Sequence, residues 1–396
     1  MSNIKVVILL SFICLASVSA SIITPALVSI EKDFSLGYGQ IEWVVSIFLI
    51  GYVLGQLFYG PIANRFGRLN ALRTGMYINL IGIVICYVAS WQLDYSWLLF
   101  GRLISAFGAA AGLSCTFILI NELLDVSQAR VSLSYTVVSF TLGNGIAVLV
   151  GGLITQYFSW QNCFVFLFVH GAVMLVLTWQ FKETLKNQQS LKFSNVISGY
   201  FNAAKSFKLI AFSFAVGVVS TFNYCYATAA PVISQLVLGL SPAGYAYWNI
   251  ICILGMLFGG YLAAKMQSYY TPIKILIISF FSIIPFLISL ILMCVADAPT
   301  KIWFFTTAMF IFVFMGTGFS AATYIATNAI EDRANSSSLM SFINMGTSTL
   351  AVIIMGYLPF STLQGFVSVV VVTFILVALL VGVCIKRYDI LRKELS

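Results

Sequence analysis

Arg102 is the charged residue of this sequence that lies inside a long apolar stretch, residues 96–122. A cation near the centre of a membrane helix costs about 2.5–3.5 kcal/mol on insertion scales, so it normally faces a cavity or a partner. On a helix Arg102 shares one stripe with Ser105, Gly112 and Thr116, which would present a small polar face. This pattern favours proton-linked gating or attraction of an anion. The alternative is that the side chain reaches the headgroups near the helix end.

Two other residues could exchange protons in or beside the apolar stretches. His170, in the middle of stretch 161–180, could titrate near neutral pH, and a structural hydrogen bond is the alternative. Glu42, at the start of stretch 41–63, is a possible proton acceptor or a solvated interfacial acid. We expect none of the twelve acids at mid-membrane depth. A permanent cation would lack a carboxylate partner there, so the sequence favours a neutral or anionic solute.

Polar and aromatic residues at helical spacing are the weaker candidates for lining a solute cavity. Such side chains equally serve packing between membrane helices. The candidates are Ser17, Ser21, Thr24, Ser105, Thr116, Phe222, Asn223, Tyr224, Tyr226, Thr317, Ser320 and Tyr324. Glycines that permit close helix packing or hinge movement are Gly143, Gly145, Gly151 and Gly152.

The composition identifies the solvent of this protein as lipid. Of its 396 residues 61% are hydrophobic and 8% are charged, against about 25% charged in a soluble domain. About 20 helical residues cross the hydrocarbon, and the sequence predicts an all-α integral membrane protein with about twelve transmembrane helices. We expect them at 4–27, 41–63, 71–90, 96–122, 132–157, 161–180, 209–235, 243–264, 272–295, 302–328, 337–357 and 364–385. The eight cysteines form no CxxC pair and there is one histidine, so we expect no metal site.

The helices fall into two sets of six. A polar, lysine-rich stretch, 182–208, is the predicted linker between an N-terminal bundle, 1–181, and a C-terminal bundle with a short tail, 209–396. The pattern Leu54-Gly55-x-Leu57-Phe58-x-Gly60-x-x-Ala63-x-Arg65 recurs 200 residues later and ends in Lys265. With the N-terminus in the cytoplasm, seventeen basic residues lie inside and two outside. We therefore expect two homologous bundles, with both termini and the linker cytoplasmic.

The residues from Gly55 to Arg68 resemble the loop 2–3 signature of the major facilitator superfamily (MFS). More narrowly, they resemble the bicyclomycin and chloramphenicol-resistance subfamily of twelve-helix drug/proton antiporters. The stretch around Arg102 is similar to the family's arginine motif on helix 4, and Gly143 through Trp160 is similar to its antiporter motif on helix 5. The resemblance covers nearly the whole chain and implies the MFS fold of two pseudo-symmetric six-helix bundles.

The resemblance also implies a cytoplasmic gating motif. Its residues here are Gly60, Asn64, Arg65, Gly67, Arg68 and Glu122. We expect Arg65 and Arg68 to pair with Glu122, and simple positive-inside anchoring is the alternative. Two positions where the family often has acids carry Asn64 and Ser21 in this sequence.

We predict a secondary active transporter that moves a small solute by alternating access. The first hypothesis, implied by the resemblance, is proton-coupled efflux of an amphipathic drug or metabolite. The second is transport of an anionic metabolite such as a carboxylate siderophore. A channel or a membrane enzyme fits less well, because no acids, histidines and cysteines converge at one depth. We expect a monomer in the bacterial inner membrane that binds a small molecule and lipid, no nucleic acid, and protons in place of a cofactor.

Overall fold

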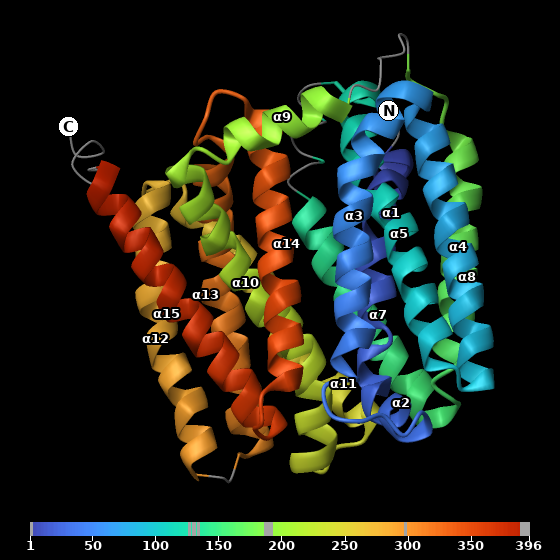
Figure 1. Ribbon diagram of the computed structural model, residues 1–396, viewed down its shortest axis with the longest axis vertical. Coiled ribbons are helices and arrows are strands. Elements are labelled where there is room, and N and C mark those ends of the chain that lie inside the picture. Colours follow the sequence, from blue (N-terminus) through green and yellow to red (C-terminus); the bar gives the residue numbers. More distant parts are fainter. Residues whose placement is uncertain are drawn as a thin grey trace. The chain divides into compact units, whose positions relative to one another are not determined.

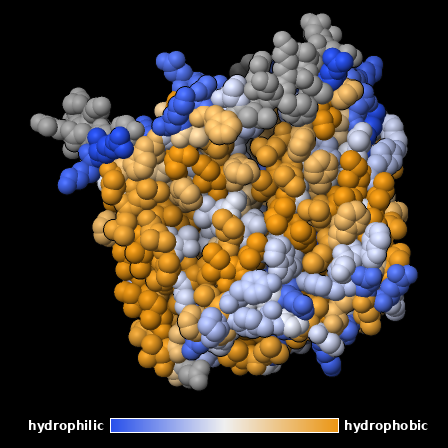
Figure 2. Space-filling model, viewed as in Figure 1, coloured by the Kyte–Doolittle hydropathy of each residue, from blue (hydrophilic) through white to orange (hydrophobic). Residues whose placement is uncertain are grey.

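The computed structural model describes residues 3–125, 128, 132, 135–185, 193–296 and 299–388. Within these residues there is no strand, and twelve helical segments are long and apolar enough to cross a membrane. This confirms the predicted all-α fold with twelve spans. The face drawn in Figure 2 is largely apolar along the helices, with hydrophilic residues gathered toward their ends. Exposed apolar side chains such as Phe281 and Leu379 are suited to lipid rather than water.

The chain forms two compact units. Unit 1 is Met1–Leu191 with Leu240–Tyr247, and unit 2 is Lys192–Gly239 with Trp248–Ser396. The helices of unit 1 are α1 (Asn3–Ser21), η1 (Thr24–Ala26), α2 (Leu27–Asp33), α3 (Glu42–Phe66), α4 (Arg68–Gln92), α5 (Tyr95–Leu123), α7 (Thr136–Tyr157), α8 (Asn162–Leu177) and η2 (Thr178–Gln180). Within this unit, α5 packs against α1, α3 and α4, and α8 packs along α4 (Figure 1).

Unit 2 contains the second set of membrane helices. Its elements are α9 (Phe193–Ala203), α10 (Phe207–Val232), η3 (Ile233–Val237, a π-helical turn), most of α11 (Pro242–Met266), α12 (Pro272–Ala296), α13 (Lys301–Thr327), α14 (Arg333–Tyr357) and α15 (Thr362–Tyr388). Helix α10 packs against α13, α14 and α15, and α12 packs against α13 (Figure 1).

Helix starts are fixed by side chains that accept hydrogen bonds from the first free N–H groups. Asp94 accepts from the Trp97 N–H before α5, and Ser206 accepts from the Leu209 N–H before α10. Thr300 accepts from the Trp303 N–H before α13. These caps lie within a few residues of the helix starts that the apolar runs predict.

The predicted end of the first helix, residue 27, is wrong. The span continues to Asp33, because η1 and α2 follow α1 with little interruption. Pro25 lies in the first turn of η1, where a missing N–H needs no partner. The proline therefore changes the helix type without ending the span.

The predicted linker also contains regular structure. Helix α9 (Phe193–Ala203) lies inside the segment 182–208, and α10 already begins at Phe207. Residues 186–192 of this segment, with Lys186 and Lys192, lie outside the described residues.

Candidate functional site

Arg102 is buried in unit 1, where α5 meets α1 and α3. Its side chain is 1% exposed. Nη1 donates to the Ser19 carbonyl at 2.8 Å, and Nε donates to the Val44 carbonyl at 3.3 Å. The guanidinium carbon lies 4.3 Å from the ring centre of Phe48. These contacts hold the charge inside the bundle, so the alternative of a side chain reaching the headgroups does not describe this structure.

The guanidinium of Arg102 keeps unused hydrogen-bonding capacity. Nη2 is buried without a hydrogen-bond partner, and no carboxylate pairs with Arg102 in the described part of the chain. Glu42, two residues before Val44 on α3, likewise has a buried Oε2 without a partner there. Unpaired buried polar atoms are costly unless a ligand, water or proton completes their hydrogen bonds. Arg102 on α5 and Glu42 at the start of α3 are therefore two candidate positions for a ligand or a proton.

The other members of the Arg102 stripe mainly serve packing. Ser105 is tied to Asn79, whose Nδ2 donates to its carbonyl at 2.8 Å and its hydroxyl at 3.1 Å. A Cβ at Gly112 would lie 2.4 Å from the Phe12 carbonyl, so α5 touches α1 closely there. Thr116 is buried, and its hydroxyl has no partner among the described residues.

The α3–α4 turn carries the predicted gating motif. Arg68 forms an ion pair with Glu122 at the end of α5, with Nη2 2.8 Å from Oε1, and its Nη1 donates to the Ala63 carbonyl at 3.1 Å. Gly67 has a backbone φ of 112°, which favours glycine. Arg68 thus ties the turn to α5.

The remaining motif residues make fewer contacts. Arg65 is exposed and pairs with no acid in the part of the chain that is described, so Arg68 alone pairs with Glu122. Asn64 is half-buried, and its side chain has no hydrogen bond to a described residue. A Cβ at Gly60 would meet nothing within 4 Å. Close packing therefore does not require a glycine at this position.

Glu183 is a site residue that the motif does not predict. Its carboxylate accepts hydrogen bonds from the N–H groups of Arg68 at 2.8 Å, Leu69 at 3.1 Å and Asn70 at 3.3 Å, the first residues of α4. A negative charge at a helix N-terminus is stabilising. The only sequence signal for Glu183 is an acid placed directly after a membrane helix.

The backbone N–H groups decide the ionisation of Glu183. Partial burial raises its pKa, but the N–H donors of Leu185, Arg68, Asn70 and Thr184 together lower it, and the net pKa falls below the ordinary value of 4.5. Glu183 is therefore a carboxylate at neutral pH. It clamps the start of α4 to the chain that follows α8 and η2.

The glycines of the predicted antiporter motif lie on α7, the fifth membrane-spanning helix, and let α7 approach its neighbours. A Cβ at Gly143 would lie 2.9 Å from the Ser17 hydroxyl, and one at Gly151 would lie 1.9 Å from the Ile22 carbonyl. A Cβ at Gly152 would lie 2.6 Å from Ala246, which belongs to unit 1. Gly145 is buried in α7. Close packing accounts for Gly143, Gly151 and Gly152.

The helix 1 candidates are buried and satisfied locally. Ser17 donates to the Cys14 carbonyl at 3.1 Å, and Thr24 donates to the Ser21 carbonyl at 2.9 Å. Ser21 is 8% exposed and ends α1. These residues shape the break between α1 and η1.

In unit 2, two aromatic candidates belong to a packed aromatic cluster. Phe222 and Tyr226 lie 5.0 Å and 5.2 Å from Phe312, measured between ring centres. The Tyr226 hydroxyl donates to Asn249 at 3.1 Å. Tyr224 beside them is buried, and Asn223 is half-buried.

The α13 candidates have three different environments. Thr317 shares a hydrogen bond with Ser279 of α12 at 2.7 Å, whereas Ser320 accepts from Gln267 at 2.7 Å. Tyr324 is 58% exposed. The structure therefore does not gather these three residues on one cavity wall.

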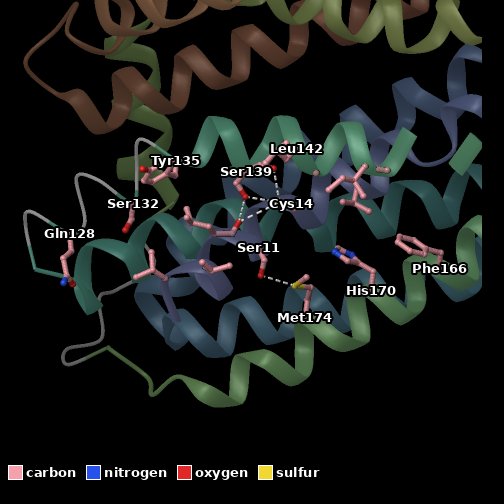
Figure 3. A pocket seen from close by; sticks show the side chains of 17 residues that line it. Ser11, Cys14, Gln128, Ser132, Tyr135, Ser139, Leu142, Phe166, His170 and Met174 are labelled. Atoms are coloured by element: carbon pink, nitrogen blue, oxygen red, sulfur yellow. Dashed lines mark hydrogen bonds between the residues drawn. The ribbon is translucent and has the colours of Figure 1, made fainter. Parts of the chain in front are cut away.

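His170 lies apart from Arg102, at a pocket that α1, α7 and α8 enclose (Figure 3). Its ring stacks on Phe166, with ring centres 6.4 Å apart. The imidazole makes no hydrogen bond to a described residue, so the alternative of a structural hydrogen bond is not found in the described part of the chain.

Comparison with known proteins gives the family. The profile of the Major Facilitator Superfamily matches residues 9–356. The chain is 22% identical over 247 residues to the bicyclomycin resistance protein homolog of Haemophilus influenzae, covering 62% of this chain and 61% of that one. It is 23% identical over 268 residues to multidrug resistance protein D of Escherichia coli, covering 67% and 66%. The chain thus spans somewhat less than two thirds of these relatives.

Solved structures share the fold. The crystal structure of a D-xylose-proton symporter superposes with a TM-score of 0.79 at 15% identity, covering 95% of this chain and 97% of that one. A bacterial homolog of the human lysosomal transporter Spinster gives a TM-score of 0.73 at 15% identity, covering 96% of both chains. With the family profile matched over most of its length, the chain belongs to the Major Facilitator Superfamily.

Proposed function

We propose that this protein is a secondary transporter that exports amphipathic drugs or metabolites, with protons as the coupling ion. Membership of the superfamily supports transport rather than an enzymatic reaction. The names of the bicyclomycin and multidrug resistance relatives support a drug-like solute. We further propose that it acts as a monomer in the bacterial inner membrane.

Arg102 is the observation that carries the coupling proposal. It is a buried cation with a free Nη2, and Glu42 on the neighbouring helix has a free Oε2. Glu42 can gain or lose a proton at the start of α3, the helix whose Val44 carbonyl accepts a hydrogen bond from Arg102. A proton on Glu42 or a solute atom at Arg102 could then bias the carrier between two conformations.

The turn network supports a gating role for the same unit. Arg68, Glu122 and Glu183 join the ends of α3, α4 and α5 to the chain after η2. These contacts are charged and partly exposed, so they can form and break at modest cost. We propose that they hold one conformation of the carrier.

An anionic solute is the second candidate. Arg102 adds a positive charge without a carboxylate partner among the described residues, which favours a carboxylate ligand. A carboxylate siderophore is one example of such a metabolite.

Ligand binding to the purified protein separates these candidates. Thermal unfolding is measured with bicyclomycin and with size-matched neutral, quaternary ammonium and carboxylate amphiphiles, for the wild type and Arg102→Ala. Neutral compounds are expected to stabilise both proteins. Stabilisation by the carboxylate alone, lost in Arg102→Ala, would establish the second candidate. Tight, selective binding of the quaternary ammonium compound would contradict both.

Proton coupling needs its own measurement. Bicyclomycin uptake into everted vesicles is followed with and without an imposed proton gradient. The proposal predicts that uptake by the wild type collapses when the gradient is dissipated. Glu42→Gln should show no uptake even with the gradient imposed. Uptake that ignores the gradient would remove the proton from the mechanism.

We also propose that both termini lie in the cytoplasm, because of the distribution of basic residues. In a background without native cysteines, a cysteine at exposed Ser35 should react with an impermeant thiol reagent added outside. One at exposed Ser268, in the α11–α12 turn, should not. The reverse pattern would invert the topology.

A further inference from the structure

A pocket of about 840 Å³ lies inside unit 1, apart from Arg102. Its floor is α1 and its walls are α7 and α8 (Figure 3). Gln128, Ser132 and Tyr135 lie at one end, and Phe166 lies at the other. A volume of this size suits a drug-sized ligand, since such pockets measure about 300–1,000 Å³.

Most polar groups between α1 and its two walls are already satisfied. Ser11 donates to the Ile8 carbonyl at 2.7 Å. The Ser139 hydroxyl donates to the Leu10 carbonyl at 2.9 Å, and the Cys14 thiol contacts Ser139 at 3.0 Å. These bonds leave little capacity for a ligand.

His170 differs from these groups. It projects from the middle of α8 toward the same space as Ser11 and Met174 (Figure 3). Its imidazole is stacked on Phe166 but has no hydrogen bond to a described residue. A neutral imidazole offers one donor and one acceptor. His170 is thus placed to bind a hydroxyl, carbonyl or amide group of a ligand.

The side chains that line the pocket indicate which charge a ligand can carry and by which route it can enter. No Asp, Glu, Lys or Arg is among the described residues that line the pocket. A charged group inside would therefore have no charged partner among these residues. Of the lining residues, apolar Val7, Leu142 and Ile146 are 64%, 43% and 58% exposed, so an apolar molecule can reach the pocket from outside unit 1 along these side chains.

We propose that this pocket binds an uncharged amphiphile taken from the bilayer, which His170 recognises through one neutral hydrogen-bonding group. The apolar body of the molecule replaces lipid contacts along α1, α7 and α8. A phospholipid acyl chain could fill the same volume, but it has no group for the imidazole. Dependence on His170 therefore distinguishes the two occupants.

Photolabelling of the purified protein in nanodiscs tests the proposal without requiring transport. The probes are a diazirine-bearing fatty alcohol and a phospholipid with the same diazirine in its acyl chain. Ile146→Trp narrows the opening. Val169→Trp is the matched control, because Val169 is 55% exposed on α8 but does not line the pocket. His170→Phe keeps a ring beside Phe166 and removes the hydrogen bond.

The fatty alcohol is expected to label α1, α7 and α8 saturably. Its labelling should fall about tenfold in Ile146→Trp and stay unchanged in Val169→Trp. In His170→Phe its half-saturating concentration should rise about fivefold to tenfold, as for the loss of one buried hydrogen bond. Phospholipid labelling should be the same in His170→Phe and wild type.

Equal labelling of wild type and His170→Phe by the fatty alcohol would overturn the proposal and leave an acyl-chain groove. Labelling outside the three helices, or unaffected by Ile146→Trp in a protein with wild-type melting, would also overturn it. If Ile146→Trp does not fold, the His170→Phe comparison decides alone. Because binding is read directly, failure of this proposal is distinguishable from failure of drug export.

Discussion

In unit 1, α3 packs against α5 at Gly55, and in unit 2, α11 packs against α13 at Gly255. A Cβ at Gly55 would lie 2.5 Å from the Phe107 carbonyl, and one at Gly255 would lie 2.7 Å from the Met309 carbonyl. The sequence repeat therefore encodes the same close contact between the second and fourth helix in each unit.

The residues beside this contact differ between the units. Five residues before Phe107 stands Arg102, and five residues before Met309 stands Phe304. Phe304 is fully buried and stacks on Tyr226, with ring centres 6.1 Å apart. One helix pair thus carries a hydrogen-bonded cation, and its repeat carries an aromatic ring.

The turns after the repeat differ in the same way. Arg68 and Glu122 form an ion pair in unit 1, whereas Gln267 donates to Ser320 at 2.7 Å in unit 2. The common packing supplies the scaffold, and the charged groups described here are concentrated in unit 1. We therefore expect proton and gating effects to depend on unit 1, and substitutions in unit 2 to act through stability.

Substitutions of Arg102 and of its counterpart Phe304 should give the largest difference in uptake between the two units. Arg102→Ala removes hydrogen bonds to the Ser19 and Val44 carbonyls, each worth about 1.5–3 kcal/mol for a charged donor. Bicyclomycin uptake by everted vesicles should fall about a hundredfold or more, and Arg102→Lys should restore little of it.

Phe304→Leu is the matched control in unit 2. It should keep uptake and lower the free energy of unfolding by about 1–1.5 kcal/mol. Normal uptake by the Arg102→Ala protein would show that the comparison of the two centres has no functional meaning.

The shared contact predicts equal losses of stability in the two units. Gly55→Ala and Gly255→Ala place a Cβ against a backbone carbonyl and should each cost about 1–3 kcal/mol. Gly60→Ala and Gly260→Ala meet nothing within 4 Å and are the controls. Thermal unfolding in detergent measures all four. A loss confined to one unit would mean that the repeat does not encode a common contact.

How far the sequence predicts these features depends on their chemistry. Apolar runs predict the twelve spans because the bilayer thickness fixes their length. Arg102 is detectable because a charge stands out in an apolar run. Its partners are backbone carbonyls, which any residue provides, so no side-chain pattern predicts them. Phe304 is unremarkable in an apolar helix, and only its place five residues before Met309, which contacts Gly255, identifies it as the counterpart of Arg102.

The two turns should differ by a smaller amount. Arg68→Met removes a partly exposed ion pair and should cost about 0.5–1 kcal/mol, an effect that salt reduces. Gln267→Met removes a neutral bond and should cost about 0.5 kcal/mol without a salt effect. Unfolding at low and high ionic strength separates them. Equal salt dependence would indicate that the charge of Arg68 is not what holds its turn.

Glu183 also gives a small expected effect, and pH reveals it. Because the folded pKa lies below 4.5, its contribution is full above the unfolded pKa and is lost as pH falls through the folded value. Glu183→Gln should therefore lower the free energy of unfolding by about 0.3–1 kcal/mol near neutral pH, the range for a charge at a helix N-terminus. Once the pH has fallen below the lowered folded pKa of Glu183, the wild type and the variant should converge, since both then carry an uncharged side chain. Glu331→Gln is the control in unit 2, because Glu331 is exposed and accepts no hydrogen bond from a described side chain. It should change the free energy of unfolding little at neutral pH. A Glu183→Gln difference that stays constant from neutral to acidic pH would show that the shape of the side chain, not its charge, caps α4.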